Sequence, residues 1–212
     1  MQSSLAVLEG KWWLGSNVSV RGLFDLICHL QYGSADGYHY EMFCDGAALD
    51  NIARRVAANP VLRCVYVAAH GSESAIYGSD ETPITRAKVR NCFTGFDANA
   101  LHGLYFGACT FADMANATFL LAGDGPYGKG SFVWVAGFDT EVPWVESSAF
   151  DFIFWNAYIN DQAGGGPSAK VKRTASYLRK TVGALADQLG FHVWVRKRGG
   201  AGATTICDLM VE

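Results

Sequence analysis

Two short apolar runs, each ending in a side chain that can act in catalysis, constrain this chain more than any other feature. Residues 65–71 read VYVAAHG and carry His70, and residues 104–109 read LYFGAC and end in Cys109. Each run is apolar on both faces, which is typical of a central parallel strand covered by helices on both sides. Ligand sites of open α/β sheets lie beyond the carboxyl ends of the strands. We therefore expect His70 and Cys109 to face a common crevice.

The composition is typical of one well-packed globular domain over residues 1–212. Half of the residues are hydrophobic and 17% are charged, which favours a large core over disorder. A net charge of −3 argues against a general nucleic-acid binder. Apolar runs stay short of the roughly 18 residues that a membrane span needs, and the N-terminus does not resemble a signal peptide. We expect a cytoplasmic protein without nucleic-acid or membrane partners.

Strand and helix patterns alternate along the chain. Strands are expected near residues 5–8, 38–43, 65–71, 104–109, 132–138 and 191–195, with a short ending near 205–207. Helices are expected near residues 21–30, 47–58, 86–93, 111–121 and 146–160, and from a Ser168 cap to about residue 189. Trp12 and Trp13 fall in a loop, residues 123–126 in a turn, and residues 72–85 in a hairpin above the sheet. The pattern predicts an α/β fold with about six mostly parallel strands and helices on both faces.

The six cysteines are scattered and show no Cys-x-x-Cys spacing. Without an export signal we expect reduced thiols rather than disulfides, and no metal site or cofactor. Cys92 and His102 form an alternative Cys/His pair, but neither lies on an expected strand. His29, His39 and His192 are expected at the surface or at an interface.

A strand ending in His-Gly, followed by a spacer and a strand ending in Ala-Cys, resembles the signature of the caspase-like cysteine peptidases. This clan includes caspases, metacaspases, legumain, gingipains and separase. Three further segments resemble short bacterial caspase-like proteins: LEGKW at residues 8–12, SVRGLFDL at 19–26, and AGFD at 136–139. The resemblance spans most of the chain and implies a caspase-like three-layer α/β/α sandwich.

The resemblance implies roles for three residues of the two blocks. Cys109 would be the nucleophile, His70 the general acid and base, and the backbone N–H groups of Gly71 and Cys109 the oxyanion hole. A free thiol with a pKa near 8.5 is mostly protonated at neutral pH, so a nearby imidazole helps to activate it. Thr110 and Phe111 stand where caspases usually have Arg-Gly, and the following segment is too short for a long cleavable linker. We therefore expect control by a partner chain or by homodimer formation.

The residue that selects the substrate stays open between two alternatives. Arg21 is the closest counterpart of the arginine with which caspases bind an acidic P1 side chain. Asp139, Glu141 and Asp25 are instead candidates for an acidic pocket that binds a basic P1 side chain. We favour the acidic pocket, through Asp139, because this residue follows the expected strand at 132–138.

The function that follows is a cysteine endopeptidase that cleaves a protein or peptide substrate. Its resemblance to short bacterial proteins implies a place in antiviral defence or programmed cell death. The alternative is a non-catalytic caspase-like module for binding or sensing, in which Trp12, Trp13 and Tyr77 contact a partner.

Overall fold

The chain is organised around one mixed β-sheet. The computed structural model describes residues 4–11, 18–93, 101–122, 132–198 and 204–211. The expected loop at Trp12 and Trp13 and the expected turn at residues 123–126 lie outside the described residues. None of the described helices combines the length and hydropathy that a membrane span requires.

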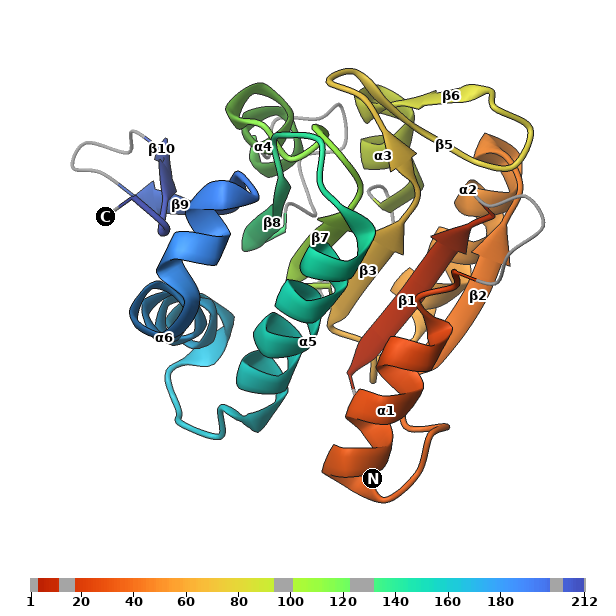
Figure 1. The fold of residues 1–212 in the computed structure, drawn as a ribbon. Coiled ribbons are helices and arrows are strands. Elements are labelled where there is room, and N and C mark those ends of the chain that lie inside the picture. The colour runs from red at the N-terminus through yellow and green to blue at the C-terminus, as the bar shows by residue number, and fades with distance from the viewer. Residues whose placement is uncertain (1–3, 12–17, 94–100, 123–131, 199–203, 212) are drawn as a thin grey trace.

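Among the described residues, seven strands form the main sheet, in the order β10-β9-β8-β7-β3-β1-β2 (Figure 1). They are β1 (Leu5–Gly10), β2 (His39–Phe43), β3 (Cys64–Ala68), β7 (Gly103–Gly107), β8 (Trp134–Phe138), β9 (Phe191–Arg198) and β10 (Thr204–Asp208). β1, β2, β3, β7 and β8 run parallel, whereas β9 is antiparallel to β8 and to β10. The expected mostly parallel sheet is confirmed. The expected number of strands is one too few, because the short ending near residues 205–207 is itself a strand.

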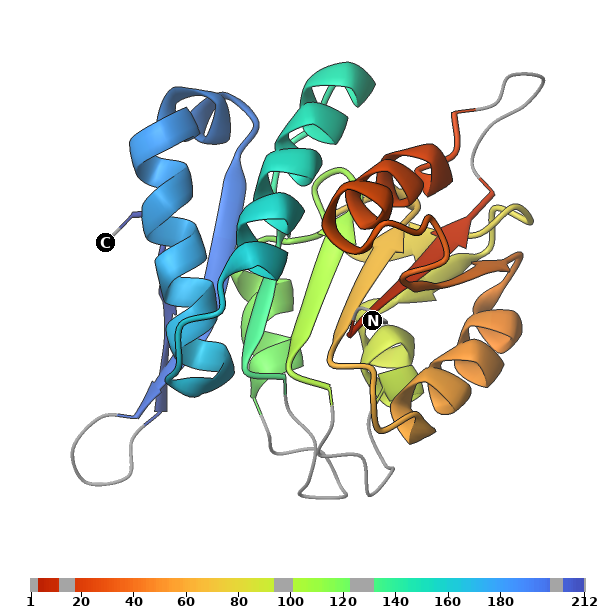
Figure 2. The same cartoon turned by 90° about the horizontal axis from the view of Figure 1, so that it is seen from below.

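Six helices within the described residues cover the two faces of this sheet. They are α1 (Arg21–Tyr32), α2 (Gly46–Ala58), α3 (Arg86–Phe93), α4 (Met114–Leu121), α5 (Trp144–Asn160) and α6 (Gly166–Gln188). α1, α5 and α6 pack on one face, and α2, α3 and α4 pack on the other, as the view from below shows (Figure 2). The molecule therefore has three layers, with the sheet between two layers of helices.

Successive residues of a central strand supply the two cores in turn. In β1, Leu5 and Val7 belong to the core beneath α1, α5 and α6, while Ala6 and Leu8 belong to the core on the opposite face. All four side chains are buried. Because side chains of a strand point alternately to opposite faces, a strand covered on both sides must be apolar at every position.

Aromatic rings make up much of the core beneath α5. Tyr66 and Tyr105 stack with ring centroids 5.2 Å apart, and Tyr105 meets Phe154 edge-on at 4.8 Å. Trp155 lies against both tyrosines. The expectation that the apolar helix near residues 146–160 is deeply packed is therefore confirmed.

A smaller sheet lies beyond the carboxyl end of β3 (Figure 1). It consists of β4 (His70–Gly71), β5 (Ala75–Tyr77) and β6 (Pro83–Thr85), paired antiparallel in that order. Ile76 and Ile84 face each other across it and are buried in the core on the α2 side. The expected hairpin at residues 72–85 is confirmed, and its apolar side chains attach it to the rest of the fold.

Both strands that were expected to end in a reactive residue are shorter than expected. β3 ends at Ala68, and His70 belongs to β4 of the small sheet. β7 ends at Gly107, so Cys109 lies in the turn that follows. After Ala68 and after Gly107 the chain turns away from the main sheet, so the strand pairing stops. After Ala68 the chain pairs with β5 instead.

Two helices, α4 and α6, begin about three residues from their expected starts. The helix expected at 111–121 begins at Met114, because the Asp113 carboxylate accepts a hydrogen bond of 2.7 Å from the N–H of Asn116 and caps the helix there. The last helix begins at Gly166 rather than after a Ser168 cap. Pro167 suits the first helical turn because its fixed φ is already helical, so the helix starts ahead of the serine.

Glu9, at the end of β1, is fully buried and joins three segments of the chain. Its carboxylate accepts hydrogen bonds from the Val20 N–H (2.9 Å), the Ser19 hydroxyl (2.7 Å) and the Tyr40 hydroxyl (2.5 Å). These bonds attach the chain leading into α1 to β1 and β2.

Replacing Glu9 with alanine should lower the free energy of unfolding by about 3 kcal/mol, because hydrogen bonds to a charged group contribute about 1.5–3 kcal/mol each and are not fully additive. Urea denaturation measures the loss. The control is Asp50→Ala, which removes an exposed ion pair with Arg54 (3.0 Å) and should cost less than about 1 kcal/mol. Equal losses in the two variants would contradict the role of Glu9.

Candidate active site

His70 and Cys109 leave two adjacent strands at the same level of the sheet. β3 and β7 pair in parallel, with Ala68 opposite Gly107. His70 and Cys109 each follow two residues later. The strand register therefore brings the two residues to the same edge, as the sequence predicted.

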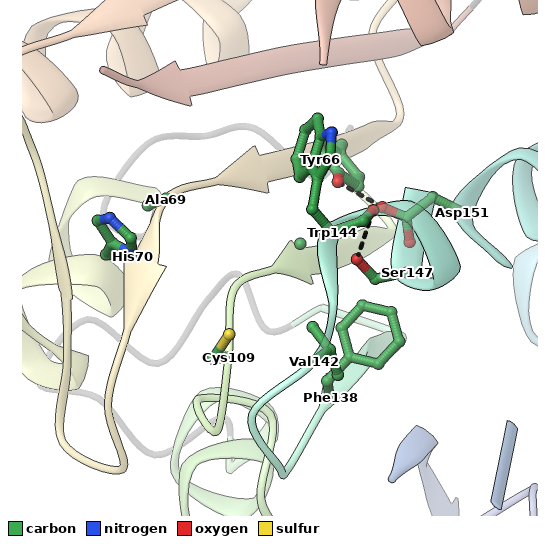
Figure 3. A pocket seen from close by; sticks show the side chains of 10 residues that line it. Tyr66, Ala69, His70, Cys109, Phe138, Val142, Trp144, Ser147 and Asp151 are labelled. Atoms are coloured by element: carbon green, nitrogen blue, oxygen red, sulfur yellow. Dashed lines mark hydrogen bonds between the residues drawn. The ribbon is translucent and has the colours of Figure 1, made fainter. Parts of the chain in front are cut away.

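A cavity of about 140 Å³, the inner pocket, lies beside Cys109 and is also lined by His70 (Figure 3). Its walls include the side chains of Tyr66, Phe138, Val142 and Trp144, and its polar lining includes Ser147 and Asp151. A cavity of about 150 Å³ can hold a benzene molecule. The inner pocket thus has room for one side chain of a ligand.

A more open cavity of about 650 Å³, the outer groove, adjoins the inner pocket. His70, Cys109 and Val142 line both cavities, so the two meet at the His70–Cys109 pair. The outer groove also carries two carboxylates, from Glu73 and Glu141. Together the two cavities can hold an extended peptide in the outer groove with one of its side chains inserted into the inner pocket.

The backbone of Gly71 lies directly against that of Cys109. A Cβ at position 71 would collide with the carbonyl oxygen of Cys109 and would lie 3.2 Å from its backbone nitrogen. A residue with any side chain would push these two segments apart, so glycine is required at this position. This close approach brings the backbone after β3 and the backbone after β7 together beside the Cys109 thiol.

The residue after Cys109 has a strained backbone. Thr110 has φ 58°, a value that a β-branched side chain rarely adopts. Its hydroxyl is buried and has no hydrogen-bond partner among the described residues. Its N–H donates to the carbonyl oxygen of Thr140 (3.0 Å), which ties the Cys109 turn to the segment after β8. Such strain costs about 1–3 kcal/mol and concentrates at functional sites.

Asp151 of α5 lines the inner pocket and is a buried carboxyl group, with 3% of its surface exposed. One oxygen accepts a hydrogen bond of 2.5 Å from the Tyr66 hydroxyl, and the other accepts one from Tyr105 (Figure 3 shows the first). Burial raises the pKa of Asp151 to about 7, although both tyrosine hydrogen bonds act to lower it. A carboxyl group that titrates near neutral pH is characteristic of a functional site.

Asp151 does not stand out in the sequence as a candidate site residue. The signal available was a single acidic residue between Phe150 and Phe152 in an otherwise apolar helix segment. A charged residue among buried aromatic side chains requires polar partners. Those partners are two tyrosines on distant strands, and the sequence pattern does not identify such pairs.

Asp139, expected to line a pocket for a basic side chain, binds His192 instead. Its Oδ2 lies 3.0 Å from Nε2 of His192, and Oδ2 of Asp208 lies 2.6 Å from Nδ1. Burial acts to lower the pKa of His192, but the hydrogen bond and charge of Asp208, with those of Asp139, outweigh it and raise the pKa. Asp139 lines neither of the two described cavities, and His192 lies inside an ionic cluster rather than free at the surface.

The other candidate specificity residues lie in two places. Glu141 lines the outer groove. Asp25 and Arg21 lie at the start of α1, where Asp25 accepts a hydrogen bond from Tyr38 (2.8 Å) and lies 3.8 Å from Nε of Arg21. The Arg21 guanidinium covers the ring of Tyr40. Neither Arg21 nor Asp25 contributes to the described lining of the two cavities.

Three other cysteines, Cys44, Cys64 and Cys92, differ from Cys109 in their surroundings. Burial raises the pKa of Cys64 to about 11 and that of Cys92 to about 12. The alternative pair of Cys92 and His102 therefore has a thiol that stays protonated. Cys44 is exposed, and Cys109 is partly exposed. Within the described residues, no group of three or more His, Cys, Asp or Glu side chains could hold a metal ion.

Replacing His192 with glutamine should reduce stability in a pH-dependent way. The pKa of His192 is raised in the folded protein above its ordinary value of 6.5, so its stabilising contribution is complete below about pH 6.5. The contribution is lost as the pH rises through the raised pKa. Urea denaturation should show a larger deficit at pH 6 than at pH 9, while the same change at the exposed His29 should shift stability by less than about 0.5 kcal/mol. A deficit that grew with pH would contradict the ionic cluster.

Comparisons with known proteins do not assign this chain to a family. No protein-family model matches it, and no curated protein is significantly similar to it. The resemblance to caspase-like peptidases is therefore carried by the residues of the strand-end motifs and their neighbours.

Proposed function

We propose that this protein is a caspase-like cysteine endopeptidase that uses His70 and Cys109. The observation that carries the proposal is the position of these two residues. They follow adjacent parallel strands in register and line both the inner pocket and the outer groove. The three layers and the mostly parallel sheet support the caspase-like form of the fold.

The proposed reaction begins with transfer of the Cys109 thiol proton to His70. The sulfur bonds to the carbonyl carbon of the scissile peptide, and the carbonyl oxygen takes the negative charge. When the carbon–nitrogen bond breaks, His70 gives the proton to the leaving amine. Water then hydrolyses the thioester, which releases the carboxylic acid and restores the thiol.

The oxyanion would be bound by the backbone N–H groups of Gly71 and Cys109. The support is the close approach of these two backbones, which a side chain at Gly71 would prevent. Loss of one oxyanion donor typically lowers the rate by 10²–10³-fold. The strained Thr110 supports the same interpretation, since it holds the Cys109 turn in an unfavourable conformation.

The substrate class is a protein or peptide, because the outer groove is large and open and the inner pocket has room for one side chain. Activation by a partner chain or a second copy, and a place in antiviral defence or cell death, stay predictions of the resemblance.

The test is cleavage of a fluorogenic peptide library with varied P1 residues, at several protein concentrations. Cys109→Ala should lower turnover by at least about 1,000-fold, and His70→Ala by at least about 100-fold. Cys44→Ala is the matched control, because this exposed thiol follows the edge strand β2 and lines neither described cavity, so its loss should leave turnover unchanged.

Reaction with iodoacetamide, followed by peptide mass mapping, gives a second readout that needs no substrate. Cys109 should react faster than the more exposed Cys44 if His70 activates it. Turnover that survives Cys109→Ala would contradict the proposal. Lack of turnover together with slower labelling of Cys109 than of Cys44 would favour the non-catalytic binding module.

A further inference from the structure

The inner pocket contains a buried carboxyl group, Asp151, that has no Lys or Arg partner among the described residues. Both oxygens of Asp151 accept hydrogen bonds from neutral tyrosine hydroxyls, and no Lys or Arg is among the residues described as lining the pocket. A buried carboxylate is costly unless it is paired. A cationic group that entered the pocket with a ligand would supply the missing partner.

We infer that Asp151 selects the substrate by binding a lysine or arginine P1 side chain in the inner pocket. This inference rests on the proposed peptidase function. The aromatic and aliphatic walls suit the methylene groups of such a side chain, and Asp151 accepts its charged end. The pocket volume of about 140 Å³ matches one side chain rather than a longer segment.

The other acidic candidates fit this function less well. Asp139 already binds His192, and Asp25 is bound to Tyr38 and Arg21 outside both described cavities. Glu141 and Glu73 line the outer groove, where they face solvent and the neighbouring part of a bound chain. The negative charges of Glu141 and Glu73 favour substrates with additional basic residues next to the P1 residue, because complementary charges steer binding.

The same geometry predicts a pH dependence of selectivity. Burial raises the pKa of Asp151 to about 7, so the group is largely neutral at pH 6 and largely ionised at pH 8. The groups that face it are Tyr66 of β3 and Tyr105 of β7, whose pKa values burial raises well above 10. His70 and Cys109 line the same pocket. A lysine side chain should therefore bind more tightly as the pH rises from 6 to 8.

The experiment measures binding to the full-length Cys109→Ala protein, so that no turnover is needed. The probes are two fluorescent hexapeptides that differ at one position, lysine in one and norleucine in the other. At pH 8 the lysine peptide should bind about 10- to 100-fold more tightly, the range for a hydrogen bond between charged groups. The difference should shrink at pH 6. Because the imidazole of His70 lines the same pocket, its contribution is removed in a second background that carries both Cys109→Ala and His70→Ala, where the pH dependence should persist.

Asp151→Asn, in the same background, should abolish the difference between the two peptides. Glu141→Gln is the matched control at the rim and should leave at least a tenfold preference for lysine. The pH dependence in the Cys109→Ala protein, which retains Asp151, tests the inference even if Asp151→Asn folds poorly.

Tighter binding of norleucine, a lysine preference that survives Asp151→Asn, or no binding of the lysine peptide would overturn the inference. Failure of the proposed function would appear differently, as lysine-selective binding in a protein that cleaves no peptide. Cleavage of peptides through Cys109 without a preference for lysine would support the proposed peptidase activity. It would contradict the role of Asp151 in substrate selection.

Discussion

The buried carboxyl group of Asp151, held between Tyr66 and Tyr105, connects the core of this protein to its candidate site. The two tyrosines stack on the adjacent strands β3 and β7, and their hydroxyls meet α5 at Asp151. Gly107 makes this possible, because a Cβ there would collide with the Tyr66 hydroxyl. The strands that end beside His70 and Cys109 are thus joined to the helix that supplies the pocket's buried acid.

The surrounding segments attach the two reactive residues to different parts of the fold. His70 begins the small sheet, which Ile76 and Ile84 anchor to the core on the α2 side. Cys109 lies in a turn, and the N–H of the following residue, Thr110, donates a hydrogen bond to Thr140 in the segment after β8. That segment is in turn held by the ion pair of Asp139 with His192. The main sheet therefore sets the position of the site, while shorter connections shape its two described cavities.

The pairing of the two strands that precede His70 and Cys109, and the position of both residues at one sheet edge, could be predicted from the sequence, because apolar runs on both faces indicate central parallel strands and such strands end at one edge. The exact strand ends could not, since they depend on pairing with β5 and on the turn at Thr110. The pocket acid was assigned to Asp139 by its position after a strand. Asp139 is paired with His192, which lies far along the chain, and Asp151 lies within an aromatic helix. The roles of these two acidic residues therefore depend on tertiary contacts that the sequence pattern does not show.

The most direct measurement is a crystal structure of the protein after reaction with a peptidyl acyloxymethyl ketone that carries lysine next to the ketone. We expect a thioether bond between Cys109 Sγ and the inhibitor's methylene carbon, with the ketone oxygen directed at the N–H groups of Gly71 and Cys109. The lysine ammonium should lie against Asp151 in the inner pocket. Attachment to Cys44, or a lysine side chain outside the pocket, would contradict the site described here.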